Sequence, residues 1–369
     1  MQPKNDKKEK RDIPNVMEMI LKPSMNVYTR QVNMDNLEDF VYLPSLLHRD
    51  DPDWTPPASR ARRKLLDSRH NTFLQENTHA VYLAFKHSLP VGCILCGIFT
   101  KPPEGMAHPC AFFSMFDAQD EETAVKLFDT ACAYAAEKGA FMILGPWSPN
   151  GTQMETGLLA DKFNAPFGYM NAYNPRTYAG YAESYGFSKH QDLYTMQFET
   201  AKGEIEKAGT KAEIQNLVGK TEGRDQTFRE KAAQLRHILE VRKDELKPFR
   251  NKTVGFYEDT GSACALPDIT AALARAHGRT MPLRKPAGDM DTLSFAQVMH
   301  AVSDEAYVDA FGGLLGMARA AGYSHIITAP APCGDRRMEA AAAAYGGRVW
   351  NTYRIYAKTV NMQTRQTLP

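Results

Sequence analysis

The sequence predicts an α/β protein that contains two copies of one mixed-sheet domain. Apolar runs of strand length alternate with helical spacing along most of the 369 residues. The same order of strands and helices then recurs in the second half of the chain. Charged residues make up 24% and hydrophobic residues 43%, a balance that allows a large core and disfavours disorder.

The first half begins with a lysine-rich polar segment, residues 1–23, which we expect to be a flexible arm. The expected strands of this half are 26–33, 80–86, 91–99, 110–116, 141–144 and 193–198. The expected helices are 36–48, 59–66, 120–138 and 176–185. Asn36 is a plausible N-cap of the first helix, and Pro44 limits its length.

The helix over 120–138 has the clearest boundary signals. Its first turn is acidic, an apolar stripe follows, and Gly139 stands where a helix ends in a left-handed residue. The two runs before it, 80–86 and 91–99, are separated by a short turn that contains a proline. This arrangement is typical of a hairpin.

The second half starts with a long charged helical stretch over 201–247, and the earlier pattern then returns. Its expected strands are 253–258, 262–266, 293–302, 325–328 and 349–358. Its expected helices are 268–277, 304–321 and 335–345. Residues 139–144 align by eye with 322–327, and 185–187 align with 345–347. We therefore expect two domains, 24–200 and 201–369, the second with a helical insertion at its start.

The charge balance excludes a general polyanion binder. There are 44 Lys and Arg residues against 43 Asp and Glu residues, a net charge of +1. The longest apolar run, 91–99, is much shorter than the roughly 20 residues of a membrane span. Six cysteines are too sparse for a disulfide scaffold, and the first residues hold no apolar leader. We expect a cytoplasmic protein with free thiols and no membrane span.

Several segments carry a resemblance to a known superfamily. They are Arg49–Pro57, Arg62–Asp67, 71–73, 145–150, 157–159, 173–175 with Tyr178, and 353–358. With the order of elements, they resemble the GNAT acyltransferases, and more narrowly the bacterial YghO-like proteins, which read as tandem GNAT-like domains. The resemblance is strongest from Tyr42 to Phe198. It implies two mixed sheets in tandem, each with a splayed fourth and fifth strand between which an acyl donor enters.

The resemblance fails at the loop that binds coenzyme A. Acetyl-CoA enzymes of the superfamily have a glycine-rich turn before the central helix, where backbone N–H groups hold the pyrophosphate. Residues 116–122 contain no glycine and four acidic side chains, and 302–309 also lack the motif. We expect no tightly bound cofactor. Acyl-CoA stays an option as a co-substrate, and we expect free acetyl-CoA to bind poorly.

The loop-rich segment 145–178 carries the candidate site residues. Glu155 is the predicted base for an amine and Tyr178 the predicted acid for the leaving group, with Asn150 beside them. Ser148 and Asn174 are predicted to bind substrate. The competing interpretation is a structural loop whose Asn and Ser side chains cap turns.

A basic stretch, Arg60 to Lys64, offers a second set of candidates. Arg62 and Arg63 are predicted to hold a phosphate-bearing donor such as CoA or the end of a tRNA. The alternative is a solvated helix face. Cys93 and Cys96 lie three residues apart in a predicted strand, so they face opposite sides and should share neither a metal nor a disulfide. We expect no metal site.

Three functions remain open at this stage. The first is an N-acyltransferase that moves an acyl group from a thioester or ester donor to an amine. The second is a Fem-type aminoacyl transferase that uses charged tRNA. The third is a non-catalytic GNAT-fold module that binds a small molecule or a partner protein.

Overall fold

The computed structural model describes residues 26–106, 109–151, 154–164, 167–201, 210–211, 226–276 and 291–360. The expected arm, 1–23, and most of the expected helical stretch between 201 and 226 lie outside these ranges. In the part of the chain that is described, no helix is both long enough and apolar enough to cross a bilayer.

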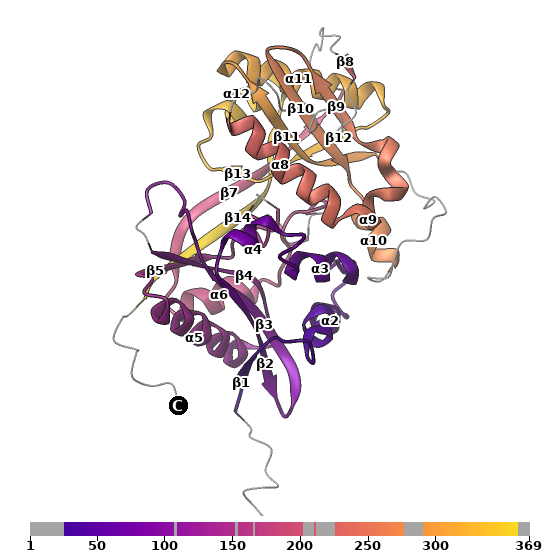
Figure 1. Ribbon diagram of the computed structural model, residues 1–369. Helices are drawn as coiled ribbons and strands as arrows, with labels where there is room; N and C mark the ends of the chain where they lie inside the picture. Colours follow the sequence, from indigo (N-terminus) through magenta and orange to yellow (C-terminus); the bar gives the residue numbers. More distant parts are fainter. Residues whose placement is uncertain are drawn as a thin grey trace, which may run out of the picture.

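The expected strands form near their expected positions. Those of the first half are β1 (Tyr28–Gln31), β2 (His79–Lys86), β3 (Leu89–Ile98), β4 (Cys110–Ala118), β5 (Met142–Gly145), β6 (Leu158–Leu159) and β7 (Ser188–Glu199). Those of the second half are β8 (Thr210–Lys211), β9 (Val254–Tyr257), β10 (Gly261–Pro267), β11 (Thr292–Ala301), β12 (His325–Thr328), β13 (Ala331–Pro332) and β14 (Arg348–Thr359). The two-residue strands β6, β8 and β13 are additional. Within the described ranges, these 14 strands form one mixed sheet (Figure 1).

The expected helices also occur in their expected order. Those of the first half are α2 (Leu37–Leu47), α3 (Ser59–Leu66), α4 (Thr72–Glu76), α5 (Glu121–Glu137) and α6 (Thr177–Ser184). Of these, α4 is an additional short helix that was not predicted. Those of the second half are α8 (Gln226–Val241), α9 (Lys243–Leu246), a 3₁₀ helix (Lys247–Lys252), α10 (Thr270–Ala276), α11 (Asp304–Ala320) and α12 (Arg336–Tyr345). Gly346 ends α12 in the left-handed conformation, with φ of 71°.

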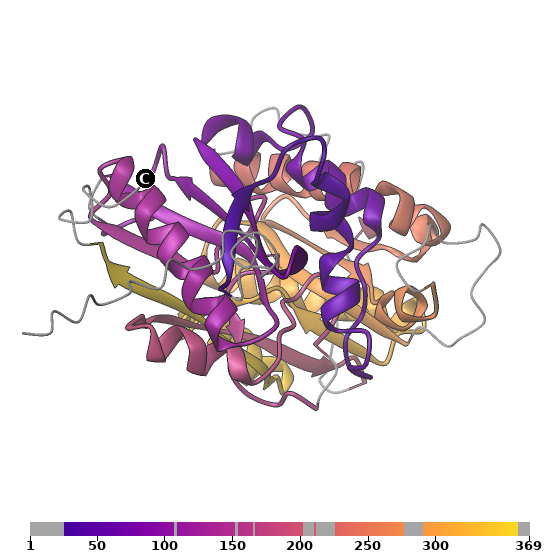
Figure 2. The same cartoon turned by 90° about the horizontal axis from the view of Figure 1, so that it is seen from below.

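Helices cover both faces of the first-half sheet (Figure 2). On one face, α5 and α6 pack on a cluster that includes Cys96 and Phe113. On the other face, Phe40 of α2 packs with Leu83 and Cys93. The two cysteines therefore face opposite sides of β3, as predicted, and both are free thiols.

The two halves exchange their last strands. The strand order is β1-β2-β3-β4-β5-β14-β7-β12-β11-β10-β9-β8. Thus β14 of the second half lies between β5 and β7 of the first half, and β7 pairs with β12 of the second half. The boundary expected near Thr200 follows β7 along the chain and stays a prediction, because the sheet itself continues across it.

The expected separation of strands is present in both halves. β4 pairs in parallel with β5 only from Cys110 to Phe112, then continues to Ala118 while β5 ends at Gly145. β11 pairs with β12 as far as Ala296, with a bulge after Leu293, and then continues to Ala301 paired with β10 but not with β12. Carboxyl ends of separating parallel strands are where α/β proteins place their binding sites.

Candidate functional site

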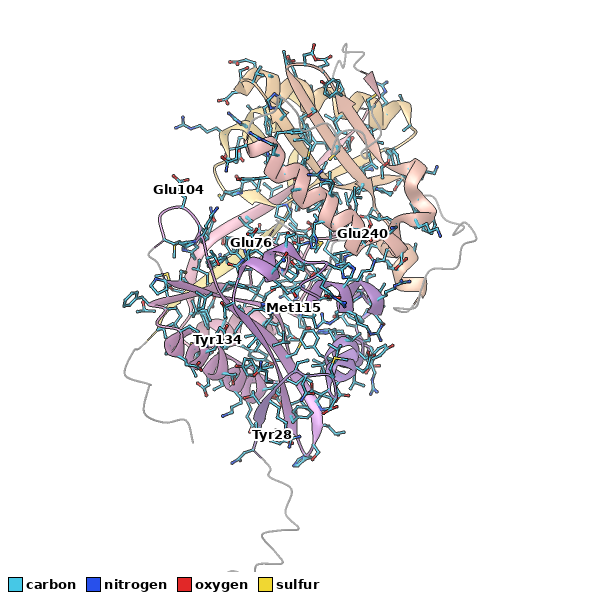
Figure 3. The ribbon with its side chains drawn as sticks, in the orientation of Figure 1. Tyr28, Glu76, Glu104, Met115, Tyr134 and Glu240 are labelled. Carbon is cyan, nitrogen blue, oxygen red and sulfur yellow. The ribbon has the colours of Figure 1, made fainter. Side chains whose placement is uncertain are left out.

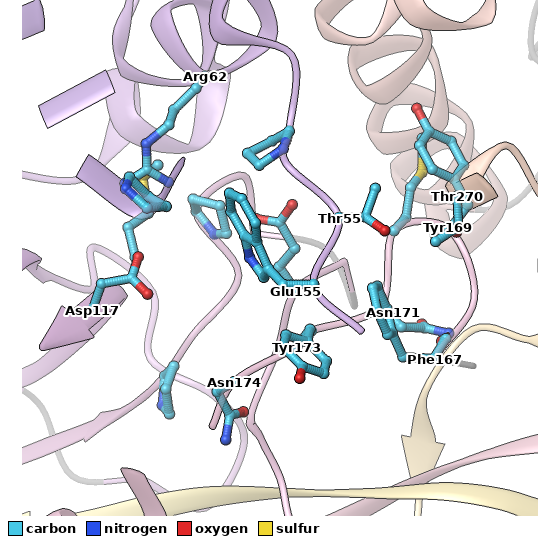
Figure 4. Close-up of a pocket in the computed structure, with 18 of the residues that line it drawn as sticks. Thr55, Arg62, Asp117, Glu155, Phe167, Tyr169, Asn171, Tyr173, Asn174 and Thr270 are labelled. Atoms are coloured by element: carbon cyan, nitrogen blue, oxygen red, sulfur yellow. The ribbon is translucent and has the colours of Figure 1, made fainter. Parts of the chain in front are cut away.

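A cavity of about 160 Å³ lies where β4 and β5 separate, between the two halves of the chain. Met115, Phe116 and Asp117 of β4 form one wall. Arg242 and Thr270 of the second half form part of another. Figure 4 shows Arg62 and Asp117 on one side of this cavity, Glu155 near its middle, and Asn171 and Thr270 on the opposite side. Both halves are therefore needed to build the site.

Three of the seven non-glycine residues with positive φ in the described ranges line the cavity. Met115, Glu155 and Met170 line it and have φ values of 49°, 53° and 70°. A residue with a side chain adopts such angles at a cost of about 1–3 kcal/mol. It stays there only when the surrounding structure fixes it, and this is most common at binding and catalytic sites.

At the β4 wall, Asp117 forms a pair with His48. Nε2 of His48 lies 2.8 Å from Oδ1 of Asp117, and His48 is only 6% exposed. Trp54, which also lines the cavity, packs on the His48 ring with the centroids 5.3 Å apart. The carboxylate is held by an imidazole behind it and faces the cavity in front. This arrangement can accept a proton from a bound molecule.

Tyr178 lies behind the same carboxylate. Its hydroxyl accepts a hydrogen bond from the Ala118 N–H at 2.9 Å and donates to Asp117 at 3.5 Å. Burial, and then the charge of Asp117, raise the pKa of Tyr178 well above its ordinary value. Tyr178 is not among the cavity-lining residues, so its geometry favours holding Asp117 in place over protonating a leaving group. The predicted acid role stays a prediction.

Opposite Asp117, a buried network joins the two halves. Arg242 donates through Nη2 to Glu155 at 2.6 Å and through Nη1 to Glu245 at 3.1 Å. Glu245, 1% exposed, also accepts from the Tyr169 hydroxyl at 2.7 Å and from the Ala58 N–H at 3.1 Å. Burial alone would lower the pKa of Arg242, but the carboxylates of Glu245 and Glu155 raise it. One cation here faces two carboxylates, so the network favours a cationic ligand.

The second opening of the sheet is filled by the first half. The Tyr169 N–H donates to Ser294 at 3.2 Å and to Asp268 at 3.3 Å. Ser294 lies in the β11 bulge, where β11 and β12 separate. A Cβ at Gly168 would lie 3.1 Å from Ser294 and 3.5 Å from Ile327 of β12. The loop thus occupies the gap in the second half, and the cavity belongs to the gap between β4 and β5.

Of the residues predicted from the sequence, Glu155, Asn174 and Arg62 line the cavity. Asn174 uses its side chain to hold the backbone, because it accepts from the Leu159 N–H at 2.7 Å. Ser148 and Asn150 are buried outside the lining and bond to each other at 2.6 Å. Their proposed roles stay predictions, and the competing structural-loop interpretation fits these contacts well.

The basic stretch is mostly tied to acidic or backbone partners. Arg63 forms a two-point ion pair with Glu38, which raises the pKa of Arg63. Arg60 pairs with Asp244 at 3.1 Å. Lys64 donates to the backbone oxygen of Glu240 at 3.1 Å, at the boundary between the halves (Figure 3).

Arg62 differs from its neighbours because it turns inward. It is 7% exposed and lies 4.5 Å above the Phe40 ring, against the cavity wall. Its guanidinium already donates to the Phe40 carbonyl at 3.3 Å. The two-arginine clamp therefore stays a prediction, and of the two arginines only Arg62 lines the cavity in the described ranges.

Sequence reasoning missed His48, Asp117, Arg242, Glu245 and Tyr169 as site residues. For Arg242 and Glu245, the sequence does contain a signal. Leu235, Ile238, Arg242 and Glu245 recur at helical spacing, and all four are buried. Charged residues on an otherwise apolar helical stripe indicate a buried polar network. No comparable signal identifies His48, which is the C-cap residue after α2 and meets its partner only through the tertiary fold.

The helix N-termini that hold phosphate in other proteins are already occupied here. The Asp120 side chain accepts from the Thr123 N–H at 2.8 Å and caps α5. Ser303 caps α11 through the Ala306 N–H at 3.1 Å. In the described ranges, no group of three His, Cys, Asp or Glu side chains is placed to hold a metal ion.

No family model matches the chain. The protein YghO of Escherichia coli K12 is 33% identical over 163 residues, which are 44% of this chain and 41% of YghO. A bacterial ceramide synthase of Caulobacter vibrioides is 29% identical over 166 residues, 44% of this chain and 42% of that protein. Each match therefore covers less than half of the curated relative.

A solved structure matches over much more of the chain. It is a tandem GNAT protein from the clavulanic acid biosynthesis pathway, 11% identical, with a TM-score of 0.51. The alignment covers 91% of this chain and 99% of that protein. The likeness confirms the fold class that the sequence predicted, a mixed α/β fold of two GNAT-like units in tandem.

Proposed function

We propose, from the tandem GNAT fold and the similarity to YghO, that this chain is an N-acyltransferase that moves an acyl group from a thioester to an amine. One observation carries the proposal. The cavity opens where β4 and β5 separate, and at that point its wall presents Asp117 backed by His48. A GNAT sheet admits its acyl donor at this gap, so a proton acceptor stands where the amine must react.

The reaction then needs few groups. The bound ammonium first loses one proton to solvent. The neutral amine nitrogen then attacks the thioester carbonyl carbon, and the new C–N bond forms as the C–S bond breaks. The proton that leaves nitrogen passes to the Asp117–His48 pair and from there to the departing thiolate. Tyr178 positions Asp117 through its hydroxyl. Proton transfer by a positioned side chain contributes about 10²- to 10⁴-fold in rate.

In this proposal, Glu155 binds the amine that accepts the acyl group. It and Asp117 are the two carboxylates of the described lining. Because Arg242 must also neutralise the buried Glu245, the network around Glu155 favours the positive charge of an incoming ammonium. Glu155 therefore binds the amine, and Asp117 takes its proton.

The donor is held without a pyrophosphate cradle. Asp120 already caps α5, and it and the acidic first turn would repel a phosphate there. Each lost charge-assisted hydrogen bond costs about 1.5–3 kcal/mol, so free acetyl-CoA should bind only at millimolar concentration. Arg62 is the first candidate for contact with the donor. Calorimetric titration with acetyl-CoA tests this, and micromolar binding that survives Arg62→Ala would contradict it.

The name of the Caulobacter relative, a ceramide synthase, also describes amide formation, because a ceramide is an N-acylated amine. The tRNA alternative has less support, because Arg60, Arg63 and Lys64 are engaged within the protein. The non-catalytic alternative does not account for a proton-accepting pair at the cavity wall.

The test is amide formation by the purified protein. We expect decanoyl-CoA and octylamine to yield the amide by mass spectrometry, with equal release of free thiol. Asp117→Asn should lower kcat at least 100-fold, because the loss of a positioned proton acceptor costs about 10²- to 10⁴-fold in rate. Asp50→Asn, at a residue that is 89% exposed, is the matched control. Absence of amide with thioester donors and amines of several lengths, or full activity of Asp117→Asn, would overturn the proposal.

A further inference from the structure

The cavity is too small for the reaction proposed in it. Its volume is about 160 Å³, whereas protein pockets that bind small molecules typically enclose about 300–1,000 Å³. An acyl thioester and an amine must meet there, so part of the wall has to move before both can enter. The part that moves should be the one with the fewest contacts to the rest of the fold.

Two sides of the cavity are firmly held. On one side, Asp117 belongs to β4, which still pairs with β3 at that residue. On the other side, the Tyr169 N–H is bonded to Ser294 of the second half at 3.2 Å. Glu155 is bonded to the buried Arg242 at 2.6 Å. Movement of either side would break the sheet or the buried network.

Residues 51–57, between α2 and α3, form a strap along another side of the cavity. Trp54, Thr55 and Pro57 of the strap line the cavity, and Figure 4 shows Thr55 there together with Tyr173. Three of the seven strap residues are prolines, which have no N–H to donate. The strap therefore has few backbone donors with which to bond to its surroundings.

One hydrogen bond holds the strap between its two ends. His48 before it and the Ala58 N–H after it are each bonded to a carboxylate elsewhere in the fold. Between these ends, the hydroxyl of Tyr173 donates to Oδ2 of Asp51 at 2.7 Å. Within the described ranges, the other hydrogen bonds of the strap are internal or reach only His48.

We propose that the strap opens to admit the substrates, and that the Asp51–Tyr173 hydrogen bond is the latch that keeps it closed. The inference rests on the proposed function, which places the reaction in this cavity. In the closed position, Trp54 packs on the ring of His48 with the centroids 5.3 Å apart, so the strap also covers the proton-accepting pair. Substrates must displace the strap, and their apparent affinity is lowered by the fraction of molecules that is closed.

Tyr173→Phe removes the latch hydroxyl and keeps the ring. Loss of a hydrogen bond to a carboxylate should favour the open strap by about tenfold. Amide hydrogen exchange, followed by mass spectrometry, should be about tenfold faster at Asp53 and Trp54, whose N–H groups bond to Asp51 within the strap. The KM for octylamine, with decanoyl-CoA as donor, should fall by up to about tenfold. A fixed wall would instead give an unchanged or higher KM.

Tyr185→Phe is the matched control. The Tyr185 hydroxyl donates to Asp129 at 2.8 Å, which is the same kind of bond, and neither residue belongs to the described lining of this cavity. This variant should leave the exchange of the strap and the KM unchanged. Asp51→Asn keeps an oxygen acceptor but removes the charge, so it should accelerate exchange less than Tyr173→Phe does.

The outcomes separate the inference from the proposed function. Unchanged exchange of the strap in a folded Tyr173→Phe would overturn the latch. Faster exchange with an unchanged or higher KM would overturn the role of the strap in admitting substrate. Failure of the wild type to form any amide would overturn the proposed function. The exchange rates of Tyr173→Phe and Asp51→Asn then still decide the latch, which faster exchange supports and unchanged exchange rejects.

Discussion

Nη2 of Arg242 lies 2.6 Å from Oε1 of Glu155, and the two residues come from different halves of the chain. The same guanidinium also holds Glu245, which is almost completely buried. This contact ties the second half to the loop that carries the first half's site residues. Stability and site geometry are therefore coupled at one side chain.

Arg242→Leu should destabilise the protein strongly, because it leaves the buried Glu245 without its cation. A broken buried ion pair costs about 3–5 kcal/mol. Glu155→Gln should cost about 1 kcal/mol or less, since Glu155 is 32% exposed and the solvent screens it. Urea unfolding followed by circular dichroism measures both. Lys243→Ala, which breaks the exposed neighbouring pair with Glu240, is the control and should have almost no effect. Equal losses for Arg242→Leu and Lys243→Ala would contradict the network.

Acid should weaken the junction of the exchanged strands. Arg354 of β14 donates to Asp192 of β7 at 2.8 Å, and this hydrogen bond lowers the pKa of Asp192. A lowered folded-state pKa gives stability above the unfolded pKa of about 3.9, and that stability is lost as pH falls through the folded pKa. Asp192→Asn should lower the free energy of unfolding by about 1 kcal/mol at neutral pH. The difference from wild type should shrink below about pH 4.

Calorimetric Tm values at several pH values test this prediction. Asp50→Asn, at a highly exposed residue, should run parallel to the wild type. A deficit of Asp192→Asn that stays constant into acid would show that the pair contributes no pH-dependent stability.

Two glycine substitutions should have opposite signs. A Cβ at Gly313 of α11 would overlap the Phe256 ring, whereas one at Gly180 of α6 meets nothing within 4 Å. Gly313→Ala should therefore destabilise by about 1–3 kcal/mol through overpacking. Gly180→Ala should stabilise by about 0.5–1 kcal/mol, because alanine has the higher helix propensity. The measurement is the Tm of both variants. An increase in Tm for Gly313→Ala as well as for Gly180→Ala would show that the packing at Gly313 relaxes easily.

The six cysteines should differ sharply in reactivity. Cys333 is exposed, whereas Cys93 and Cys96 are buried in different clusters on opposite faces of β3. Burial raises the pKa of Cys93 to about 12, so its reactive thiolate is scarce. A thiol reagent should label Cys333 quickly, and Cys333→Ser should remove that phase. Rapid native-state labelling of Cys93 would mean that β3 opens or that the α2 face is loosely packed.

Much of the fold was predictable because helices and strands leave a local hydrophobic periodicity in the sequence. The helix α5 has an acidic first turn, the Asp120 cap and Gly139 at its end, all within one short segment. Pairing between distant strands leaves no such local mark. Both β7 and β14 have the apolar pattern of a buried strand. That pattern does not indicate which half of the chain each strand completes. The exchange of these strands therefore became visible only in the structure.

The site was predictable to a smaller extent for the same reason. Glu155 was found because it lies in a polar, non-repetitive loop after a buried strand. Its partner Arg242 lies in a charged helical stretch, where most charges are solvated. Asp117 was interpreted as a repulsive charge at a helix start, whereas β4 continues through it and turns it toward His48. These roles depend on which segments meet in three dimensions.

The strand exchange also constrains synthesis on the ribosome. The edge of β5 is paired by β14, which is made only after the other strands of the second half. Until then the nascent first half carries an open edge beside its future site. Unpaired edges of this kind are prone to pair with other chains. The first-half sheet can therefore complete its pairing only after nearly all of the strands have emerged, and we expect chains stalled early in translation to be prone to aggregation.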